Sequence, residues 1–296
     1  MTSSIKSIMN ENVLDKTVLV RADLNIPMSN GNISDQSRVE RVIPTINFLK
    51  WSGAKIVICS HLGRPNGKYN KNYTLKPLVE ILSNILETNV RFSNSCLGKE
   101  ALEIKTSLKA GEILLLENVR FHKEEINNSL SFAKKLSEGC DLFVNDAFSC
   151  SHRAHSSLHA ITNFLPSYSG KLMDEEIKAL ISVLSSPIKP VAALVGGAKI
   201  STKINIIEYL ITKMDYLIIG GAMANTFLVA EGLDVGKSLF EKDSVNIAKS
   251  ILKESKKINC EIILPIDVVV SKSFETNGST KICLLYTSPS PRDIMR

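Results

Sequence analysis

The chain has 296 residues, about twice the length of a typical domain, so its length predicts two domains. Hydrophobic residues make up 44% of it and charged residues 22%, as in globular proteins, and no apolar run approaches the roughly 20 residues that span a bilayer. The net charge of +6 allows a nucleic acid or a small anionic ligand as partner, but the lysines form no basic run. Residues 1–12 carry no secretory or transit signal, so we expect a cytoplasmic protein. Since the chain has neither a long apolar run nor a basic run, we expect it to bind neither membrane nor nucleic acid.

Short apolar runs alternate with helical patterns through the first half of the chain. The runs are β-branched or leucine-rich, which predicts strands at 17–23, 55–60, 112–118 and 142–146. The segments between them place apolar residues three and four positions apart, which predicts helices at 38–53, 74–87 and 130–139. Strands that are apolar throughout and alternate with helices are typical of a parallel sheet covered on both faces.

The same alternation restarts after one amphipathic helix, predicted at 171–186 and ended by Pro187 and Pro190. Strands are predicted at 191–197, 215–221 and 261–270, and helices at 201–213 and 244–257. We therefore predict an α/β fold of two doubly wound, Rossmann-like parallel-sheet domains joined by a helix, the second domain incomplete because it has about half the usual strands. The expected parts are an N-terminal domain (1–170), the interdomain helix (171–186) and a partial C-terminal domain (187–282).

Residues 283–296 read CLLYTSPSPRDIMR and show no strand or helix period. They also do not continue the alternation of strands and helices that precedes them. We interpret them as a non-native tail from vector, adapter or frameshifted sequence and leave them out of the predicted fold.

No metal site is predicted from the cysteines and histidines. The six cysteines are scattered without a C-x-x-C pair, which indicates reduced thiols packed as small hydrophobes. A helix would place His152, His155 and His159 on one face near Cys150, but these spacings match no structural zinc pattern. Packing or helix capping is the simpler expectation for His155 and His159.

Polar residues follow each predicted strand of the first half, and the carboxyl ends of parallel strands meet at one edge of a sheet. A guanidinium group pairs bidentately with phosphate or carboxylate, and a glycine lets the backbone approach a ligand closely. Scattered surface ion pairs would explain any single arginine here, but four arginines at strand ends favour a small, anionic, hydroxylated ligand. The candidate residues are Asp23, Asn25, Arg38, His61, Gly63, Arg64, Arg120, His152 and Arg153.

Two double-glycine turns in the second half suggest a nucleotide phosphate site. VGGAKISTK and IIGGAMANTF each follow a predicted strand and open a helix, where backbone N–H groups and the helix N-terminus favour phosphate. Lys199 and Lys203 are four apart and are expected on one side of the first helical turns. GLDVGKS (232–238) is no P-loop, because it has three residues where that motif needs four. The candidate residues are Gly197, Lys199, Lys203, Gly220 and Gly221.

Several stretches of the chain closely resemble the phosphoglycerate kinase family and follow the family's order. They are VLVRADLNIP, SRVERVIPTI, GAKIVICSHLGRPNGK, LLLENVRFH, FVNDAFSCSHRAHSS, VGGAKISTKI, LIIGGAMANTFL and ILPIDVVV. The resemblance implies a glycolytic kinase that transfers a phosphoryl group reversibly between 1,3-bisphosphoglycerate and ADP, giving 3-phosphoglycerate and ATP, with Mg²⁺ bound to the nucleotide. It also implies a monomer whose lobes close about the 171–186 helix.

The resemblance assigns roles to the candidate residues. Lys203 and Gly221 would bind the nucleotide, and Lys199 and Arg38 would be the catalytic residues that neutralise the phosphoryl group in transit. No general base is needed, because the acceptor oxygen is already anionic. The residues implied to hold phosphoglycerate are Asp23, Asn25, Arg38, His61, Arg64, Arg120, His152 and Arg153.

The family's pattern continues for about half a lobe beyond the segments matched here. That part includes a glycine-rich loop with the acid that holds magnesium, a carboxylate for the nucleotide ribose and a terminal segment that packs on the first lobe. The alternative interpretation is therefore a catalytically incomplete phosphoglycerate-binding protein. Lys199 and Lys203 favour the kinase, because a protein that only binds phosphoglycerate would not need them.

Overall fold

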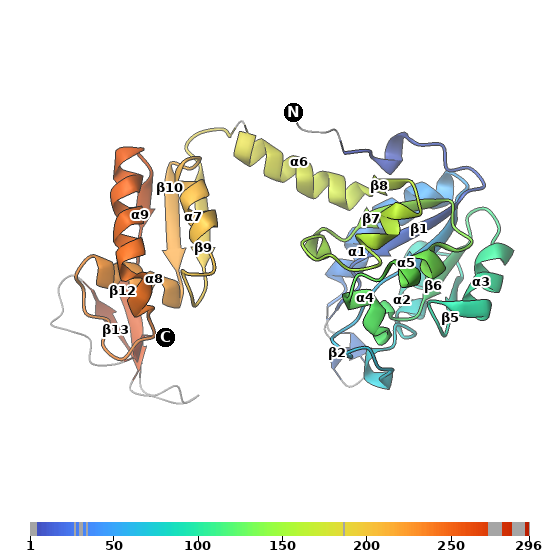
Figure 1. Cartoon of the computed structure of the whole chain (residues 1–296), viewed down its shortest axis with the longest axis horizontal. Helices are drawn as coiled ribbons and strands as arrows, with labels where there is room; N and C mark the ends of the chain where they lie inside the picture. The colour runs from blue at the N-terminus through green and yellow to red at the C-terminus, as the bar shows by residue number, and fades with distance from the viewer. Residues whose placement is uncertain are drawn as a thin grey trace. The chain divides into compact units, whose positions relative to one another are not determined.

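The computed structural model describes residues 5–26, 28–29, 32–33, 35–185, 187–271, 280–285 and 294–295. The chain divides into two compact units, Met1–Ala179 and Leu180–Arg296 (Figure 1). The boundary between them falls inside the predicted helix at 171–186, which is present as α6 (Lys171–Ser185).

The first unit is built on a six-stranded parallel sheet in the order β5-β6-β4-β1-β7-β8. β1 is buried along its whole length, and its Leu19 lies opposite Val57 of β4 and Phe143 of β7. The four strands predicted in this half are therefore confirmed, and they are adjacent in the sheet. The strands are β1 (Thr17–Ala22), β4 (Lys55–Cys59), β5 (Val90–Ser93), β6 (Ile113–Leu116), β7 (Leu142–Asp146) and β8 (Ser167–Ser169).

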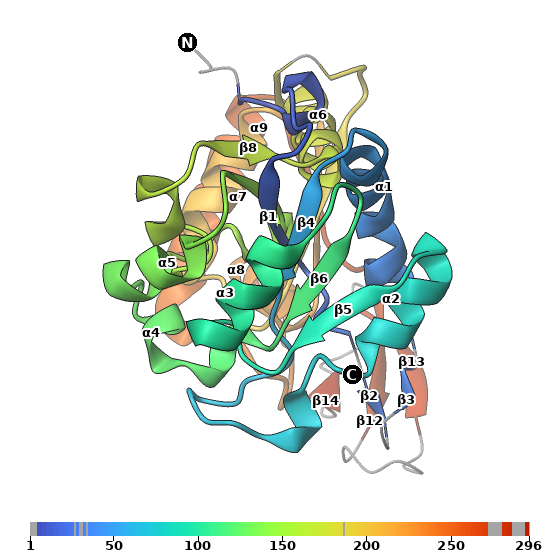
Figure 2. The same ribbon diagram turned by 90° about the vertical axis from the view of Figure 1, so that its right-hand side faces the viewer.

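Helices cover both faces of this sheet because alternate strand residues point to opposite sides. Val18 and Val20 of β1 pack with α1 and α2, which lie to the right of the strands in Figure 2. Leu19, between them, packs with α3 and α5 on the other face. The helices are α1 (Ser37–Trp51), α2 (Leu78–Leu86), α3 (Gly98–Ser107), α4 (Lys123–Ile126) and α5 (Leu130–Ser137), and a short hairpin joins β2 (Met28–Ser29) to β3 (Asn32–Ile33).

The second unit contains a three-stranded parallel sheet in the order β11-β10-β9. Val195, Leu217 and Ile219 form its core with residues of α7, α8 and α9. On the opposite face Leu194 is 74% exposed, so in the described part of this unit helices cover only one face, against the expectation of two. The elements are β9 (Ala192–Gly196), α7 (Ile204–Ile211), β10 (Tyr216–Gly220), α8 (Ala222–Ala230), α9 (Val245–Lys257) and β11 (Glu261–Ile263).

The prediction of a single strand at 261–270 is wrong. Pro265 separates two strands, β11 and β12 (Asp267–Ser271), that belong to different sheets. β12 pairs antiparallel with β13 (Thr280–Leu284) and with β14 (Ile294–Met295). The expectation of no strand from residue 283 onward is also wrong for Cys283 and Leu284, which end β13, and for Ile294 and Met295, which form β14. Buried Cys283 packs in the second core. The rest of the expected tail, 286–293 and residue 296, lies outside the described residues.

All six cysteines are free thiols, and only Cys140 is more than slightly exposed. Four of them lie in the first unit and two, Cys260 and Cys283, in the second. Within the described ranges, no helix is long and apolar enough to cross a membrane.

Candidate active site

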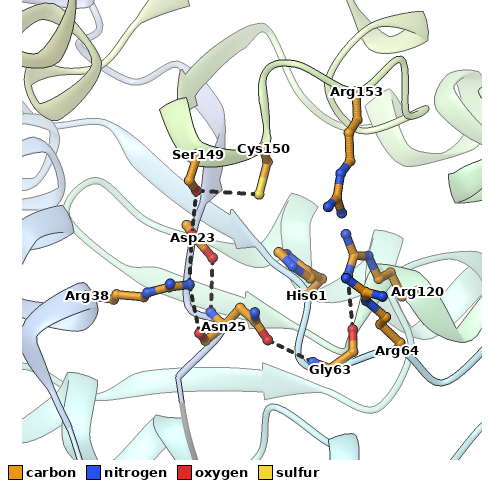
Figure 3. Close-up of a pocket in the computed structure, with 10 residues that line it drawn as sticks. All are labelled: Asp23, Asn25, Arg38, His61, Gly63, Arg64, Arg120, Ser149, Cys150 and Arg153. Atoms are coloured by element: carbon orange, nitrogen blue, oxygen red, sulfur yellow. Dashed lines mark hydrogen bonds and ion pairs between the residues drawn. The ribbon is translucent and has the colours of Figure 1, made fainter. Parts of the chain in front are cut away.

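A cavity of about 250 Å³ opens where β1, β4, β6 and β7 end, at the carboxyl edge of the first sheet (Figure 3). These strands are neighbours in the sheet, so the loops that follow them meet at one place. The cavity contains eight of the nine residues predicted for this site, all except His152. Its lining residues are Asp23, Asn25, Arg38, His61, Gly63, Arg64, Arg120, Ser149, Cys150 and Arg153.

Arg38 extends from the first turn of α1 across the loop that follows β1. Its Nη1 donates to Asp23 Oδ2 at 3.1 Å and to the Asn25 carbonyl at 2.9 Å, and half of the side chain stays exposed. Ser149 Oγ donates to the same Asp23 oxygen at 2.5 Å. The protein thus orients the guanidinium through Nη1, while its other N–H groups have no acceptor among the residues that the structure describes.

Gly63 holds the next loop in a conformation that other residues strain to adopt. Its φ is +60°, and a Cβ there would lie 2.3 Å from Cε1 of Tyr73. Its N–H donates to Asn25 Oδ1 at 2.8 Å, and its carbonyl accepts from Arg120 Nη1 at 2.9 Å. The two loops are therefore hydrogen-bonded to each other around the cavity.

Arg120 lies in a short 3₁₀ helix after β6 and is 4% exposed. Burial, followed by the nearby charges of Arg21 and Arg153, lowers its pKa. Its Nε is buried without a hydrogen-bond partner among the described residues. A buried guanidinium with an unused donor favours an anionic ligand that supplies the missing acceptor.

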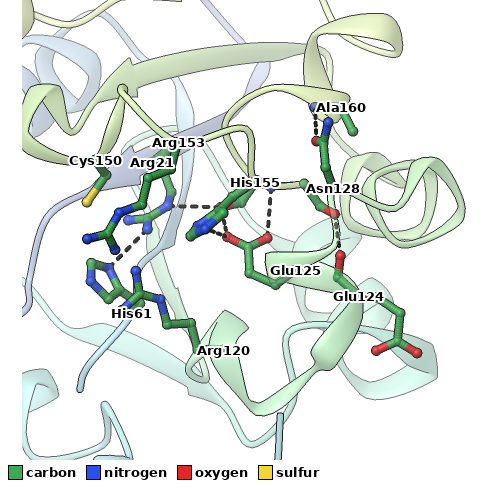
Figure 4. Close-up of polar contacts among 12 residues, drawn as sticks. Arg21, His61, Arg120, Glu124, Glu125, Asn128, Cys150, Arg153, His155 and Ala160 are labelled. Atoms are coloured by element: carbon green, nitrogen blue, oxygen red, sulfur yellow. Dashed lines mark hydrogen bonds and ion pairs between the residues drawn. The ribbon is translucent and has the colours of Figure 1, made fainter. Parts of the chain in front are cut away.

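His61 is a neutral side chain in this site. Burial first, and then the positive charges of Arg21, Arg120 and Arg153, lower its pKa to about 2. Arg21, which was not among the predicted residues, is fully buried under the cavity and donates from Nη2 to His61 Nδ1 at 3.0 Å (Figure 4). Its signal in the sequence is a single cation inside the apolar strand VLVRA.

The charges around the cavity select an anion. The guanidinium groups of Arg38, Arg64, Arg120 and Arg153 line it, against the one carboxylate of Asp23. Ligand atoms of Asp23, His61 and Cys150 lie within 4.8 Å of one another, close enough to hold a metal ion. The surrounding guanidinium groups would repel such a cation, so these three residues more readily serve an anionic ligand.

His152 and His159 lie on turns and His155 lies in irregular backbone between them, so no α-helix aligns the three. His152 is exposed and does not line the cavity, but its Nε2 lies 3.1 Å from Nε of Arg153, which does. His155 is buried beside Glu125 at 3.9 Å, and His159 contacts Asn128 at 3.0 Å. His155 is therefore a packing residue as expected, whereas His159 is exposed and precedes a 3₁₀ helix without a capping hydrogen bond from its side chain.

The two glycine turns of the second unit lie against each other. The N–H of Met223 donates to the Gly197 carbonyl at 2.8 Å, and a Cβ on Gly221 would lie 3.0 Å from that oxygen. Gly220 ends β10 directly before this contact, and Gly221 has a φ of +69°. The backbones approach this closely only because these positions lack side chains.

The placement predicted for Lys199 and Lys203 in the first helical turns is wrong, because α7 begins at Ile204. Ser201 bonds Glu241 through its N–H and its hydroxyl, in a turn at 201–203 that precedes the helix. Lys203 is the residue before the helix, and its Cε lies 3.2 Å from the place of a Cβ on Gly197. Lys199 is exposed in the loop between Gly197 and this turn.

Together the fold and the cavity define an α/β protein with a cationic site for a small anion. A family model described as phosphoglycerate kinase matches residues 8–294. The chain belongs to the phosphoglycerate kinase family. The predicted fold class of two Rossmann-like units is confirmed by this match and by the solved structures that the chain resembles.

Relatives and solved structures agree with this assignment. Phosphoglycerate kinase of Methylorubrum extorquens (strain PA1) is 46% identical over 280 residues, 95% of this chain and 70% of the relative. That of Rhodopseudomonas palustris is 47% identical over 278 residues, 94% of this chain and 70% of the relative. The structure of phosphoglycerate kinase from Coxiella burnetii has a TM-score of 0.84 and 37% identity, covering 98% of this chain and 73% of its own. That from Pyrococcus horikoshii OT3 has a TM-score of 0.81 and 34% identity, covering 96% and 72%.

Proposed function

We propose that this chain catalyses reversible phosphoryl transfer between 1,3-bisphosphoglycerate and ADP, giving 3-phosphoglycerate and ATP, as a glycolytic phosphotransferase with a carboxyl group as acceptor. Family membership supports this function. The observation that carries it is the cavity of the first unit, where four guanidinium groups face one carboxylate. The alternative of a protein that only binds phosphoglycerate is not favoured, because Lys199 and Lys203 accompany a second candidate site.

In the first unit, we assign the cavity to phosphoglycerate. Arg64, Arg120 and Arg153 pair with its anionic groups, and His61 donates one neutral N–H. Asp23 and Asn25 serve the hydroxyl group, while His152 adds a contact at the mouth of the site. Arg38 lies where it can neutralise the phosphoryl group in transit, since among the described residues only its Nη1 has protein acceptors.

In the second unit, we assign the glycine turns to the nucleotide phosphates. Gly197, Gly220 and Gly221 let the backbone approach the phosphates, and Lys203 supplies a charge beside Gly197. Lys199 is proposed to neutralise charge on the transferred group together with Arg38.

Magnesium accompanies the nucleotide phosphates in this proposal and neutralises part of their charge. Within the described part of the second unit, no group of three or more His, Cys, Asp or Glu side chains is placed to hold a metal ion. We propose that its protein ligand lies in the part of the family's length that this chain does not cover. We also propose a cytoplasmic monomer.

Calorimetric titration of the 296-residue chain tests the proposal. The chain should bind one equivalent of 3-phosphoglycerate and, separately, Mg-ADP. A coupled assay that follows ATP formation from 1,3-bisphosphoglycerate and ADP then measures turnover. Absence of any heat with 3-phosphoglycerate at millimolar concentration would contradict the assignment of the cavity.

A further inference from the structure

Below the cavity lies a chain of buried hydrogen bonds that reaches no ligand directly. It runs from Glu125 on α4 through Ser157 and Arg21 to His61, and we call it the Glu125 relay (Figure 4). Glu125, Ser157 and Arg21 are each fully buried, and none of them lines the cavity. Their positions in the sequence, 136 residues apart at most, give no local hint of this connection.

The direction of every bond in the relay follows from which atoms carry hydrogen. The Ser157 hydroxyl has one hydrogen, which it donates to Glu125 Oε1 at 2.7 Å, so its oxygen accepts from Arg21 Nε at 3.0 Å. The Ser157 backbone N–H also donates to Glu125, to Oε2 at 2.9 Å. Both carboxylate oxygens of Glu125 therefore hold Ser157 in one orientation.

The same reasoning fixes the tautomer of His61. Arginine has only donors, so His61 Nδ1, 3.0 Å from Arg21 Nη2, must accept. The ring proton then lies on Nε2, the nitrogen left to a ligand in the cavity. A buried Arg21 also needs a compensating charge, and Glu125 supplies one at the far side of Ser157.

We propose that Glu125 and Ser157 are positioning residues for phosphoglycerate binding, because they orient Arg21 so that His61 presents Nε2–H to the ligand. The inference rests on the proposed function of the cavity. A purely structural alternative is that Ser157 only fastens its loop to α4, without effect on His61 or on the ligand.

The chain offers a matched pair of serines for the test. Ser156 is as buried as Ser157, but its hydroxyl donates to the Glu124 carbonyl at 2.8 Å and does not contact Arg21. Ser157→Ala removes the acceptor of Arg21, whereas Ser156→Ala removes a comparable buried hydroxyl outside the relay. Ser157→Thr keeps the hydroxyl and serves as the conservative variant.

Three measurements are made on each variant of the 296-residue chain. Long-range ¹H–¹⁵N NMR spectra of the ligand-free protein report the ¹⁵N chemical shift of His61 Nδ1. They also report which of the two ring nitrogens carries the proton. Calorimetry with 3-phosphoglycerate gives the affinity, and thermal unfolding gives the stability. Ser157→Ala should change the Nδ1 shift and weaken binding about tenfold, the effect of losing one hydrogen bond to a charged group. Ser156→Ala should change neither, and Ser157→Thr should retain both.

Three results would overturn the proposal. The first is a His61 proton on Nδ1 in the unmodified chain, which would reverse the deduced bonds. The second is an unchanged His61 spectrum and affinity in Ser157→Ala. The third is an equal loss of affinity in Ser156→Ala and Ser157→Ala, in proportion to the loss of stability in each. If the unmodified chain binds no 3-phosphoglycerate, the proposed function fails, and the ligand-free spectra still test the relay.

Discussion

The two candidate sites are held together by different parts of the polypeptide. In the first unit, side chains make the connections: Arg38 bonds the side chain of Asp23, and Arg120 bonds the backbone carbonyl of Gly63. In the second unit, the backbones of Gly197 and Gly221 touch, and the nearby Lys199 is exposed to solvent. The first site therefore combines particular polar side chains with one position, Gly63, that has no room for a Cβ, whereas the contact in the second site is made by backbone at Gly197 and Gly221.

The largest expected effect is the loss of a polar group from the first site. Arg38→Ala should weaken 3-phosphoglycerate binding on the order of a hundredfold, since removing one member of a charge pair costs several kcal/mol of binding free energy. The free energy of unfolding should change by less than about 1 kcal/mol, because the side chain is half exposed.

Arg41→Ala is the matched control for this change. Arg41 lies on the same helix, is similarly exposed and pairs with Glu176 at 2.8 Å, outside the cavity. Calorimetry and urea unfolding on both variants separate binding from stability. An equal loss of stability and affinity in Arg38→Ala would show that Arg38 is a structural residue.

The buried state of His61 predicts a pH effect on stability. Its pKa is about 2 in the folded protein and near 6.5 when unfolded, so only the unfolded chain gains this proton as the pH falls below 6.5. Protonation of His61 in the unfolded chain therefore lowers the free energy of unfolding by about 2 kcal/mol as the pH falls from 6.5 to 5. His61→Gln should remove this part of the pH dependence, as measured by urea unfolding at pH 6.5 and pH 5. An identical change in the free energy of unfolding in the two proteins would contradict a neutral, buried His61.

The smallest expected effect comes from adding one carbon atom to the second site. Gly221→Ala places a Cβ 3.0 Å from the Gly197 carbonyl at a φ of +69°, and should weaken Mg-ADP binding about tenfold while leaving 3-phosphoglycerate affinity unchanged. Gly232→Ala is the control, because Gly232 also has a positive φ but open space around it. If both variants lose the same nucleotide affinity, backbone strain matters and the contact between the turns does not.

Much of the first unit could be predicted because its four central strands are uninterrupted apolar runs with polar residues directly after them. The short edge strand β5 and helix α3 were missed, since α3 buries only Ala101 and Lys105 and so lacks a clear apolar face. The site was predicted because parallel strands bring their carboxyl ends together whatever lies between them.

The parts that could not be predicted depend on contacts between distant residues. The start of α7 at Ile204 is set by Ser201 bonding Glu241, 40 residues away. The link between Glu125 and Ser157 likewise spans 32 residues. Two features did have a local signal: the strand break at Pro265, because proline cannot continue a central strand, and Arg21, a single cation inside an apolar strand.

Each unit contains buried cysteines, so thiol alkylation can report the unfolding of each unit separately. Burial raises the pKa of the Cys59 thiol to about 12, so Cys59 forms no appreciable reactive thiolate while the first unit is folded. Burial likewise raises the pKa of Cys260, which is 2% exposed in the second unit. In dilute iodoacetamide, the alkylation rate at each position therefore measures how often that unit unfolds, and peptide mass spectrometry can read both rates from a single sample.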